Sequence, residues 1–240
     1  MDLGLRDRAC IVTGASKGLG LAIARGLVAE GARVLIVARH EAELERAAGE
    51  IGAAWHAADL REPDAADAVI AAAQRWVGGV DVLVNNAGIA EVVDLDDETD
   101  EQWQRDWDLH VMAAMRLMRA ACPLMAANGW GRVVNVSSSS GKRPSGTLAL
   151  SYSVTKAGLL ALSRGFAGRR AMLSSGSSKS NRSTRNGSSR MKRGASRQDL
   201  GGRQGACQCA FRMQACPASP HCLASRATRP AGRSRATRPC

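Results

Sequence analysis

Short apolar runs alternate with longer stretches of helical apolar spacing over residues 5–167, and this alternation restricts the fold more than any other feature. The strand-like runs lie at 9–13, 33–38, 53–57, 80–88 and 131–138. The helical stretches lie at 18–30, 41–51, 63–76, 99–128 (broken near Pro123) and 151–167. Strict alternation of apolar strands and helices is typical of a parallel sheet covered on both faces. We therefore predict an α/β fold with a doubly wound, Rossmann-type sheet in strand order 3-2-1-4-5.

The composition changes abruptly near residue 167. Residues 1–167 hold 17 Lys/Arg against 21 Asp/Glu, whereas residues 168–240 hold 16 Lys/Arg against the single acid Asp199. No Ile or Val follows Val154. A segment so poor in large apolar residues and so rich in like charge buries too little surface to offset its chain entropy. We therefore predict a folded domain over 1–167 and a disordered, basic, low-complexity tail over 168–240.

The run "TGASKGLG" at 13–20 places three glycines where the first strand ends and a helix begins. A helix N-terminus offers unpaired backbone N–H groups and a partial positive charge, and glycines let an anion approach that backbone closely. A phosphate site is one interpretation, and a plain strand–helix turn is the other. The glycines alone do not choose between them.

Two further motifs, "NNAG" (85–88) and "YSVTK" (152–156), follow the glycine loop in the same order as in a known family. With them the sequence resembles the classical short-chain dehydrogenase/reductase family, with 3-oxoacyl-carrier-protein reductases among its nearest likenesses, over roughly residues 5–167. The resemblance implies an enzyme that transfers hydride between a nicotinamide cofactor and a small-molecule ketone or secondary alcohol.

The resemblance also implies which residues bind the cofactor. They come from the glycine loop and from the ends of the later strands: Gly14, Ser16, Lys17, Gly18, Leu19, Gly20, Arg39, Asp59, Leu60, Asn86, Ala87, Gly88, Tyr152 and Lys156. Asn85 belongs to the motif that steadies the central strand. A helix N-cap before Pro63 is the alternative role for Asp59.

The end of the second strand indicates which nicotinamide cofactor binds. An acid at that place favours NAD, but here the sequence reads "VARH" with Ala38 and Arg39 and no carboxylate. Arg39 can bind a 2′-phosphate through paired N–H donors, and Lys17 adds a second positive charge. We therefore predict NADP(H), with solvated surface cations as the alternative interpretation.

Tyr152 and Lys156 lie four residues apart, which on a helix places both on one face. A free phenol, with a pKa of ~10, is a sluggish proton donor, and a nearby ammonium favours its ionised form. By resemblance Tyr152 is the general acid/base, Lys156 also holds the nicotinamide ribose, and Ser138 in the run 137–140 bonds the substrate carbonyl. His110 stands where the family has Asn, so either a proton relay or a packing role is open for it.

The last third of the chain departs from the family. No later strands, nicotinamide-facing turn or substrate lid are recognisable after residue 167, so we predict missing C-terminal strands, with 131–138 left as an exposed edge. We hypothesise that the tail derives from a GC-rich coding sequence read out of frame. A truncated member that binds nucleotide without turnover is the first alternative function. Non-specific polyanion binding through the tail is the second, because no nucleic-acid reading motif is present.

Other classes of site and location are constrained by absences in the sequence. No apolar stretch approaches the roughly 20 residues of a membrane span, and no signal peptide is recognisable, so we expect a cytoplasmic protein. Cys10 and Cys122 are expected to be reduced core thiols. The tail cysteines lack the spacing of a structural zinc site, so no metal is predicted. Self-association into a homo-oligomer is expected.

Overall fold

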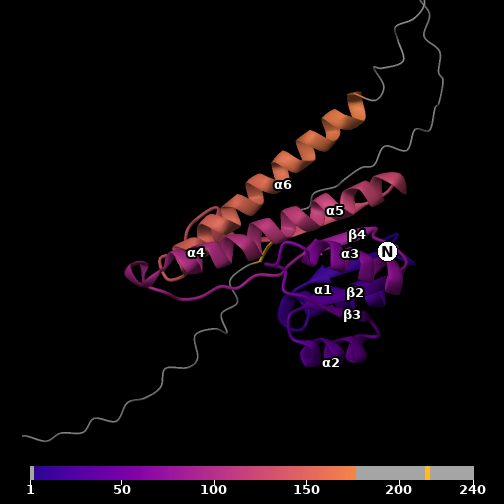
Figure 1. Cartoon of the computed structure of the whole chain (residues 1–240), viewed down its shortest axis with the longest axis horizontal. Helices are drawn as coiled ribbons and strands as arrows, with labels where there is room; N and C mark the ends of the chain where they lie inside the picture. The colour runs from indigo at the N-terminus through magenta and orange to yellow at the C-terminus, as the bar shows by residue number, and fades with distance from the viewer. Residues whose placement is uncertain (1–2, 177–213, 217–240) are drawn as a thin grey trace, which may run out of the picture.

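The computed structural model describes residues 3–176 and 214–216, and a parallel sheet forms the centre of this part (Figure 1). Its strands are β1 (Ala9–Thr13), β2 (Arg33–Ala38), β3 (Ala54–Ala57), β4 (Val82–Asn85), β5 (Arg132–Ser138) and β6 (Gln214–Cys216). The order across the sheet is β3-β2-β1-β4-β5-β6, with all pairings parallel. The first five strands confirm the predicted doubly wound fold.

Helices connect successive strands. They are α1 (Gly18–Ala29), α2 (Glu41–Ile51), α3 (Ala65–Val77), α4 (Asp100–Trp107), α5 (Ala113–Ala127) and α6 (Leu150–Gly176), with short helices η1 (Leu95–Asp97), η2 (Asp108–Met112) and η3 (Ser139–Gly141). The single helix predicted over 99–128 is interrupted by η2, a π-helical turn, whereas Pro123 lies inside α5. The prediction of a break near Pro123 is therefore wrong. Single π-helical turns are often found at functional sites.

The two faces of the sheet bury two separate apolar clusters. Ile11 of β1 packs in the cluster with α3 and α5, and its neighbour Val12 packs in the cluster with α1 and α2. This alternation follows from the period of two along a strand. Both faces are covered, which explains why the strands read as continuous apolar runs.

The expectation of an exposed fifth strand is wrong for the second half of β5. Val136–Ser138 of β5 pairs in parallel with Gln214–Cys216 of the C-terminal region. Val133 is 1% exposed and Val136 is 9% exposed, because both pack in the apolar clusters. Strand pairing uses backbone N–H and C=O groups, so a segment without Ile or Val can still form β6. The rest of the predicted tail, 177–213 and 217–240, lies outside the described residues.

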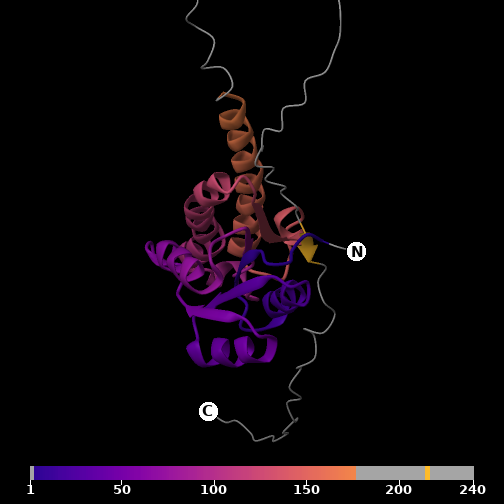
Figure 2. The same cartoon turned by 90° about the vertical axis from the view of Figure 1, so that its right-hand side faces the viewer.

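Helix α6 runs from Leu150 to Gly176, beyond the end predicted at residue 167. Its last turns extend away from the sheet in both views (Figures 1 and 2). Leu159 and Leu160 are buried, whereas Leu162 and Phe166 are partly buried. The first half of the helix is thus firmly packed, and this half carries Tyr152 and Lys156.

Both predicted core thiols, Cys10 and Cys122, are buried, and neither forms a disulfide within the described residues. Burial raises the pKa of Cys10 to about 12, so this thiol stays protonated. Within 3–176 and 214–216, no helix has the length and apolar character needed to cross a membrane. The same residues contain no group of three His, Cys, Asp or Glu side chains that could hold a metal ion.

Candidate active site

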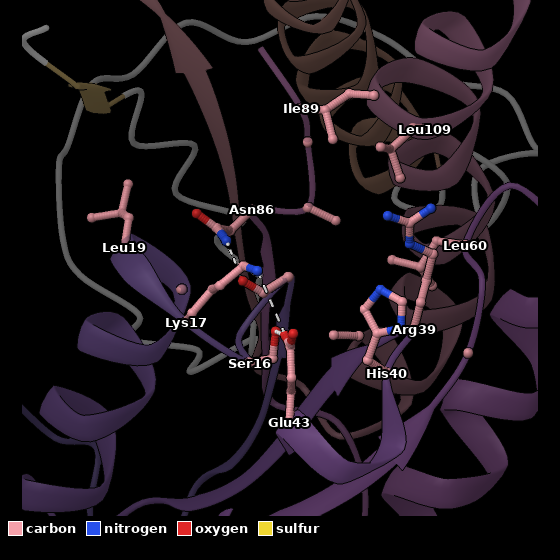
Figure 3. Close-up of a pocket in the computed structure, with 16 residues that line it drawn as sticks. Ser16, Lys17, Leu19, Arg39, His40, Glu43, Leu60, Asn86, Ile89 and Leu109 are labelled. Carbon is pink, nitrogen blue, oxygen red and sulfur yellow. Dashed lines mark hydrogen bonds and ion pairs between the residues drawn. The ribbon is translucent and has the colours of Figure 1, made fainter. Parts of the chain in front are cut away.

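A cleft of about 360 Å³ opens where β1, β2 and β4 end (Figure 3). Ligands of doubly wound sheets collect at this carboxyl edge. Most of the residues predicted to bind cofactor line it: Gly14, Ser16, Lys17, Leu19, Gly20, Arg39, Leu60, Asn86, Ala87 and Gly88. Gly18, Asp59, Tyr152 and Lys156 are not among its lining residues.

The glycine loop approaches the end of β4 so closely that no side chain fits. A Cβ added at Gly14 would lie 2.7 Å from the Ala87 Cα, and Gly14 has a φ of +65°. A Cβ at Gly20 would lie 2.2 Å from the Gly14 carbonyl oxygen. Helix α1 begins after Lys17 with no side-chain cap and no acid in its first turn. This cradle suits the close approach of an anionic pyrophosphate, so the residues present fit a dinucleotide.

Asn86 fastens the glycine loop to β4. Its Nδ2 donates to the carbonyl oxygens of Thr13 at 2.9 Å and of Gly14 at 3.1 Å. Thr13 Oγ1 accepts from the backbone N–H groups of Asn86 and Ala87 and donates to the Val84 carbonyl. Sequence analysis did not single out Thr13, because its role depends on a contact with a strand far along the chain.

Asn85 points into the core instead. Its Nδ2 donates to Asn135 Oδ1 at 2.7 Å, and Asn135 Nδ2 donates to Ser163 Oγ at 2.8 Å. Ser163 in turn donates to the Leu159 carbonyl at 2.7 Å. This buried chain of hydrogen bonds joins β4, β5 and α6, and it agrees with the expected role of Asn85 in steadying the central strand.

Lys156 is 4% exposed, and its Nζ donates to the Val136 carbonyl at 3.1 Å. Burial lowers the pKa of Lys156 from 10.5 to about 8. The Nζ lies 5.7 Å from the centroid of the Tyr152 ring. A Cβ at Gly88 would lie 3.2 Å from this Nζ, so the cofactor-cleft loop and the Tyr152–Lys156 pair are direct neighbours.

His110, from the π-helical turn, lies beside the same pair. Its ring meets the Tyr152 ring edge-on, with centroids 5.6 Å apart. Nδ1 lies 2.8 Å from Thr155 Oγ1, and Nε2 accepts from the Ile89 backbone N–H at 3.0 Å. Burial, and then the charge of Lys156, lower the pKa of His110 from 6.5 to about 3. The imidazole is therefore neutral.

The serine run 137–140 begins at the end of β5, and its members differ in burial. Ser137 is buried, and its hydroxyl donates to the Lys156 carbonyl at 3.0 Å. Ser138 is partly exposed, and its oxygen accepts from the Ser140 backbone N–H at 3.1 Å. A hydroxyl that accepts one bond still has its hydrogen to donate. The Ser138 hydroxyl hydrogen is therefore still able to donate to a ligand, whereas that of Ser137 is already used in the bond to the Lys156 carbonyl.

The chain is similar to known proteins over most of its described length. The family model described as short chain dehydrogenase matches residues 8–171. The chain belongs to the short-chain dehydrogenase family. An uncharacterised oxidoreductase of Bacillus subtilis, YvrD, is 39% identical to this chain over 171 residues, which cover 70% of this chain and 64% of that protein. Galactitol 2-dehydrogenase of Agrobacterium fabrum is 34% identical over 159 residues, 65% of this chain and 62% of that protein.

Solved structures of the same family are also similar to this chain. L-Sorbose reductase from Gluconobacter frateurii, complexed with NADPH and L-sorbose, is 36% identical with a TM-score of 0.67. The match covers 72% of this chain and 67% of that one. The chain therefore spans somewhat less than two-thirds of the length of the two curated relatives, and about two-thirds of the reductase.

Asp59 forms an ion pair with Arg61 that the motif did not predict. Its carboxylate accepts from Arg61 Nε at 3.0 Å, and this bond is the main reason why the pKa of Asp59 is lowered. Helix α3 begins after Asp64, so the alternative role of Asp59 as an N-cap is wrong. Leu60, next in the chain, lines the cleft.

A carboxylate that sequence analysis missed also lines the cleft. Glu43 Oε2 accepts from Ser16 Oγ at 3.1 Å and lies 3.7 Å from Lys17 Nζ. The prediction considered an acid only at the end of β2, whereas Glu43 reaches the cleft from the first turn of α2. Its place in the first turn of the helix that follows β2 is the sequence signal that could have found it.

Two acidic residues outside the family motifs, Glu98 and Asp106, accept hydrogen bonds from the first residues of α6. Glu98 accepts from the backbone N–H groups of Leu150 and Ser151, the latter at 3.0 Å. The buried carboxylate of Asp106 accepts from Ser151 Oγ at 2.8 Å and pairs with Arg105 at 3.1 Å. Negative charge at a helix N-terminus is stabilising, so these residues fix the helix that carries Tyr152 and Lys156.

Proposed function

We propose that this protein is an NADP(H)-dependent oxidoreductase that reduces a ketone or oxidises a secondary alcohol. The observation that carries the proposal is that Gly88 of the glycine-loop cleft lies beside the Tyr152–Lys156 pair, since a Cβ on Gly88 would be 3.2 Å from Lys156 Nζ. The nicotinamide supplies or accepts the hydride when bound.

The proposed catalytic groups each handle a proton or a charge. Tyr152 Oη donates the proton to the carbonyl oxygen during reduction and accepts it back during oxidation. Lys156 places positive charge beside the phenol. Because Lys156 is buried, water screens this charge less, so it stabilises the ionised form of the phenol more strongly. Ser138 donates its hydroxyl hydrogen to the same carbonyl oxygen.

The proposed preference for NADP(H) rests on Arg39 and Lys17, which both line the cleft. A hydrogen bond to a charged group contributes about 1.5–3 kcal/mol, or roughly ten- to over a hundredfold in affinity. Replacing Arg39 with Asp is expected to reverse the preference between NADPH and NADH. Equal affinities in the unaltered chain contradict the assignment.

For the substrate we propose a polyol, a ketose or a related secondary alcohol or ketone. This class comes from the similarity to galactitol 2-dehydrogenase and to L-sorbose reductase. A simple β-ketoester is used as a test substrate because the sequence also resembles 3-oxoacyl-carrier-protein reductases.

The test is a fluorescence titration with NADPH followed by assays with L-sorbose, galactitol and a β-ketoester. Binding with turnover that Tyr152→Phe abolishes, while binding persists, supports the proposal. Binding without turnover favours the second candidate, a nucleotide-binding member without activity, because the match spans only 64% of the Bacillus relative. If neither NADPH nor NADH binds, both candidate functions are overturned.

Self-association is also proposed. Trp107, Leu150 and Val154 are exposed apolar side chains at the end of α4 and the start of α6, and exposed apolar residues of this size favour burial against another surface. Light scattering coupled to size-exclusion chromatography tests this. The cytoplasmic location and the polyanion-binding alternative stay predictions, the latter because most of 168–240 lies outside the described residues.

A further inference from the structure

Two donors in the cleft are already engaged by an acid of the same chain. Ser16 Oγ donates to Glu43 Oε2 at 3.1 Å, and Lys17 Nζ lies 3.7 Å from the same oxygen (Figure 3). Glu43 is the one carboxylate among the described residues that line the cleft. An anion of this protein therefore occupies the donor pair at the end of the glycine loop.

These donors belong to the part of the cleft with the most positive charge. Arg39 and His40 line it from the end of β2, opposite Lys17 (Figure 3). Ser16 is buried, whereas the side chains of Lys17 and Glu43 are 77% and 37% exposed. The ion pair can therefore open without unfolding, while the serine hydroxyl stays in place.

We propose that Glu43 is a specificity-determining residue that competes with the 2′-phosphate of NADP(H) for Ser16 and Lys17. This inference rests on the proposed function, in which Lys17 and Arg39 bind that phosphate. A phosphate monoester carries about −1.5 to −2 charges near neutral pH, so it is repelled by a carboxylate on the same donors. The 2′-hydroxyl of NADH meets no such repulsion. Glu43 thus weakens the preference for NADP(H) that the two cations create.

The size of the effect follows from the exposure of the pair. Exposed ion pairs contribute little, because water and salt screen them. We therefore expect a change of roughly three- to tenfold in NADPH affinity rather than a complete switch, since each factor of ten needs about 1.4 kcal/mol.

The experiment compares Glu43→Gln with the unaltered protein and with Glu45→Gln as a matched control. The amide keeps the shape of Glu43 and can still accept from Ser16. Glu45 lies on the exposed face of α2, outside the cleft lining. Dissociation constants for NADPH and NADH are measured by fluorescence at low and high salt. Thermal shifts with adenosine 2′,5′-bisphosphate and with 5′-AMP give a readout that needs no nicotinamide.

The expected result is that Glu43→Gln tightens NADPH binding three- to tenfold, changes NADH binding less than twofold, and loses most of this difference at high salt. Glu45→Gln should change neither constant. Weaker NADH binding in Glu43→Gln overturns the inference in favour of a ribose-binding role, and unchanged constants overturn it outright. If the unaltered protein prefers NADH, the proposed cofactor preference fails, yet tighter NADPH binding by Glu43→Gln still supports the competition.

Discussion

The backbone N–H of Ile89 donates a hydrogen bond to Nε2 of His110, with 3.0 Å between the two nitrogens. Because Nε2 accepts, the hydrogen of the neutral ring is on Nδ1, which lies 2.8 Å from Thr155 Oγ1. The hydroxyl hydrogen of Thr155 goes to the Ser151 carbonyl at 2.8 Å, so its oxygen accepts from Nδ1. Both ring nitrogens are used inside the protein, and the ring joins the loop after β4 to α6.

A proton relay through His110 requires one of these bonds to break, so of the two roles left open by the sequence we expect the packing role, in which the ring positions the residues that it joins. The loop that His110 holds includes Gly88, which lies beside Lys156: a Cβ on Gly88 would be 3.2 Å from Lys156 Nζ. His110 thus links the cofactor cleft to the helix with the proposed acid/base.

The first prediction concerns the pH dependence of folding at His110. Its pKa is about 3 in the folded protein against 6.5 as the ordinary value, so the unfolded chain takes up a proton first as the pH falls. Stability from the neutral ring is complete above pH 6.5 and is lost as the pH falls from 6.5 towards 3. Between pH 7 and 5 we expect the unaltered protein to lose about 2 kcal/mol more than His110→Asn, measured by urea unfolding. Parallel pH curves for the two proteins contradict this.

The second prediction is that Lys156→Met stabilises the protein while it abolishes turnover. Burial lowers the pKa of Lys156 to about 8, so below that pH the folded state carries a buried charge that the unfolded chain hydrates freely. We expect a gain of about 2 kcal/mol at pH 7, after about 1 kcal/mol for the lost bond to the Val136 carbonyl.

The gain in stability from Lys156→Met should depend on pH, because the pKa of Lys156 is lower in the folded protein than in the unfolded chain. The cost of the charge is full below pH 8 and vanishes as the pH rises to 10.5, so the gain from Lys156→Met should shrink over that range. The exposed Lys142→Met serves as the control and should change stability little. A loss of stability in Lys156→Met at pH 7 contradicts the prediction.

The third prediction compares two glycines of α1. Gly20→Ala places a Cβ 2.2 Å from the Gly14 carbonyl oxygen, so we expect it to displace the glycine loop and to weaken nucleotide binding and stability together. Gly26→Ala meets nothing within 4 Å and should stabilise the helix by about 0.5–1 kcal/mol without changing nucleotide affinity. Urea unfolding and NADPH titration of both variants measure this. Equal effects at the two positions are incompatible with the close approach at Gly20.

The fourth prediction concerns the cap of α6. Glu98→Ala removes the acceptor for the Leu150 and Ser151 backbone N–H groups and should cost about 1 kcal/mol of unfolding free energy. Glu98→Gln keeps an acceptor but loses the charge, so a smaller loss is expected. Amide exchange at Leu150 and Ser151 should become faster in Glu98→Ala. Asp96→Asn, in the preceding short helix, is the control, and an equal loss there argues against the cap.

Local patterns in the sequence were enough to predict the five strands β1–β5, their order, and the place of the glycine loop. Strand alternation and helical spacing are properties of neighbouring residues, so they can be recognised without tertiary contacts. The Tyr152–Lys156 pair also follows from local geometry, because a spacing of four always shares one helix face.

Contacts between distant segments could not be predicted in this way. Glu43 reaches Ser16 from another helix, Glu98 caps a helix that begins at Leu150, and β6 pairs with β5 across a long stretch of chain. The tautomer of His110 depends on Ile89 and Thr155, which come from a loop and a helix on either side of it. Such contacts arise only when the core packs and brings these segments together, because packing fixes which polar atoms meet after the local elements have formed.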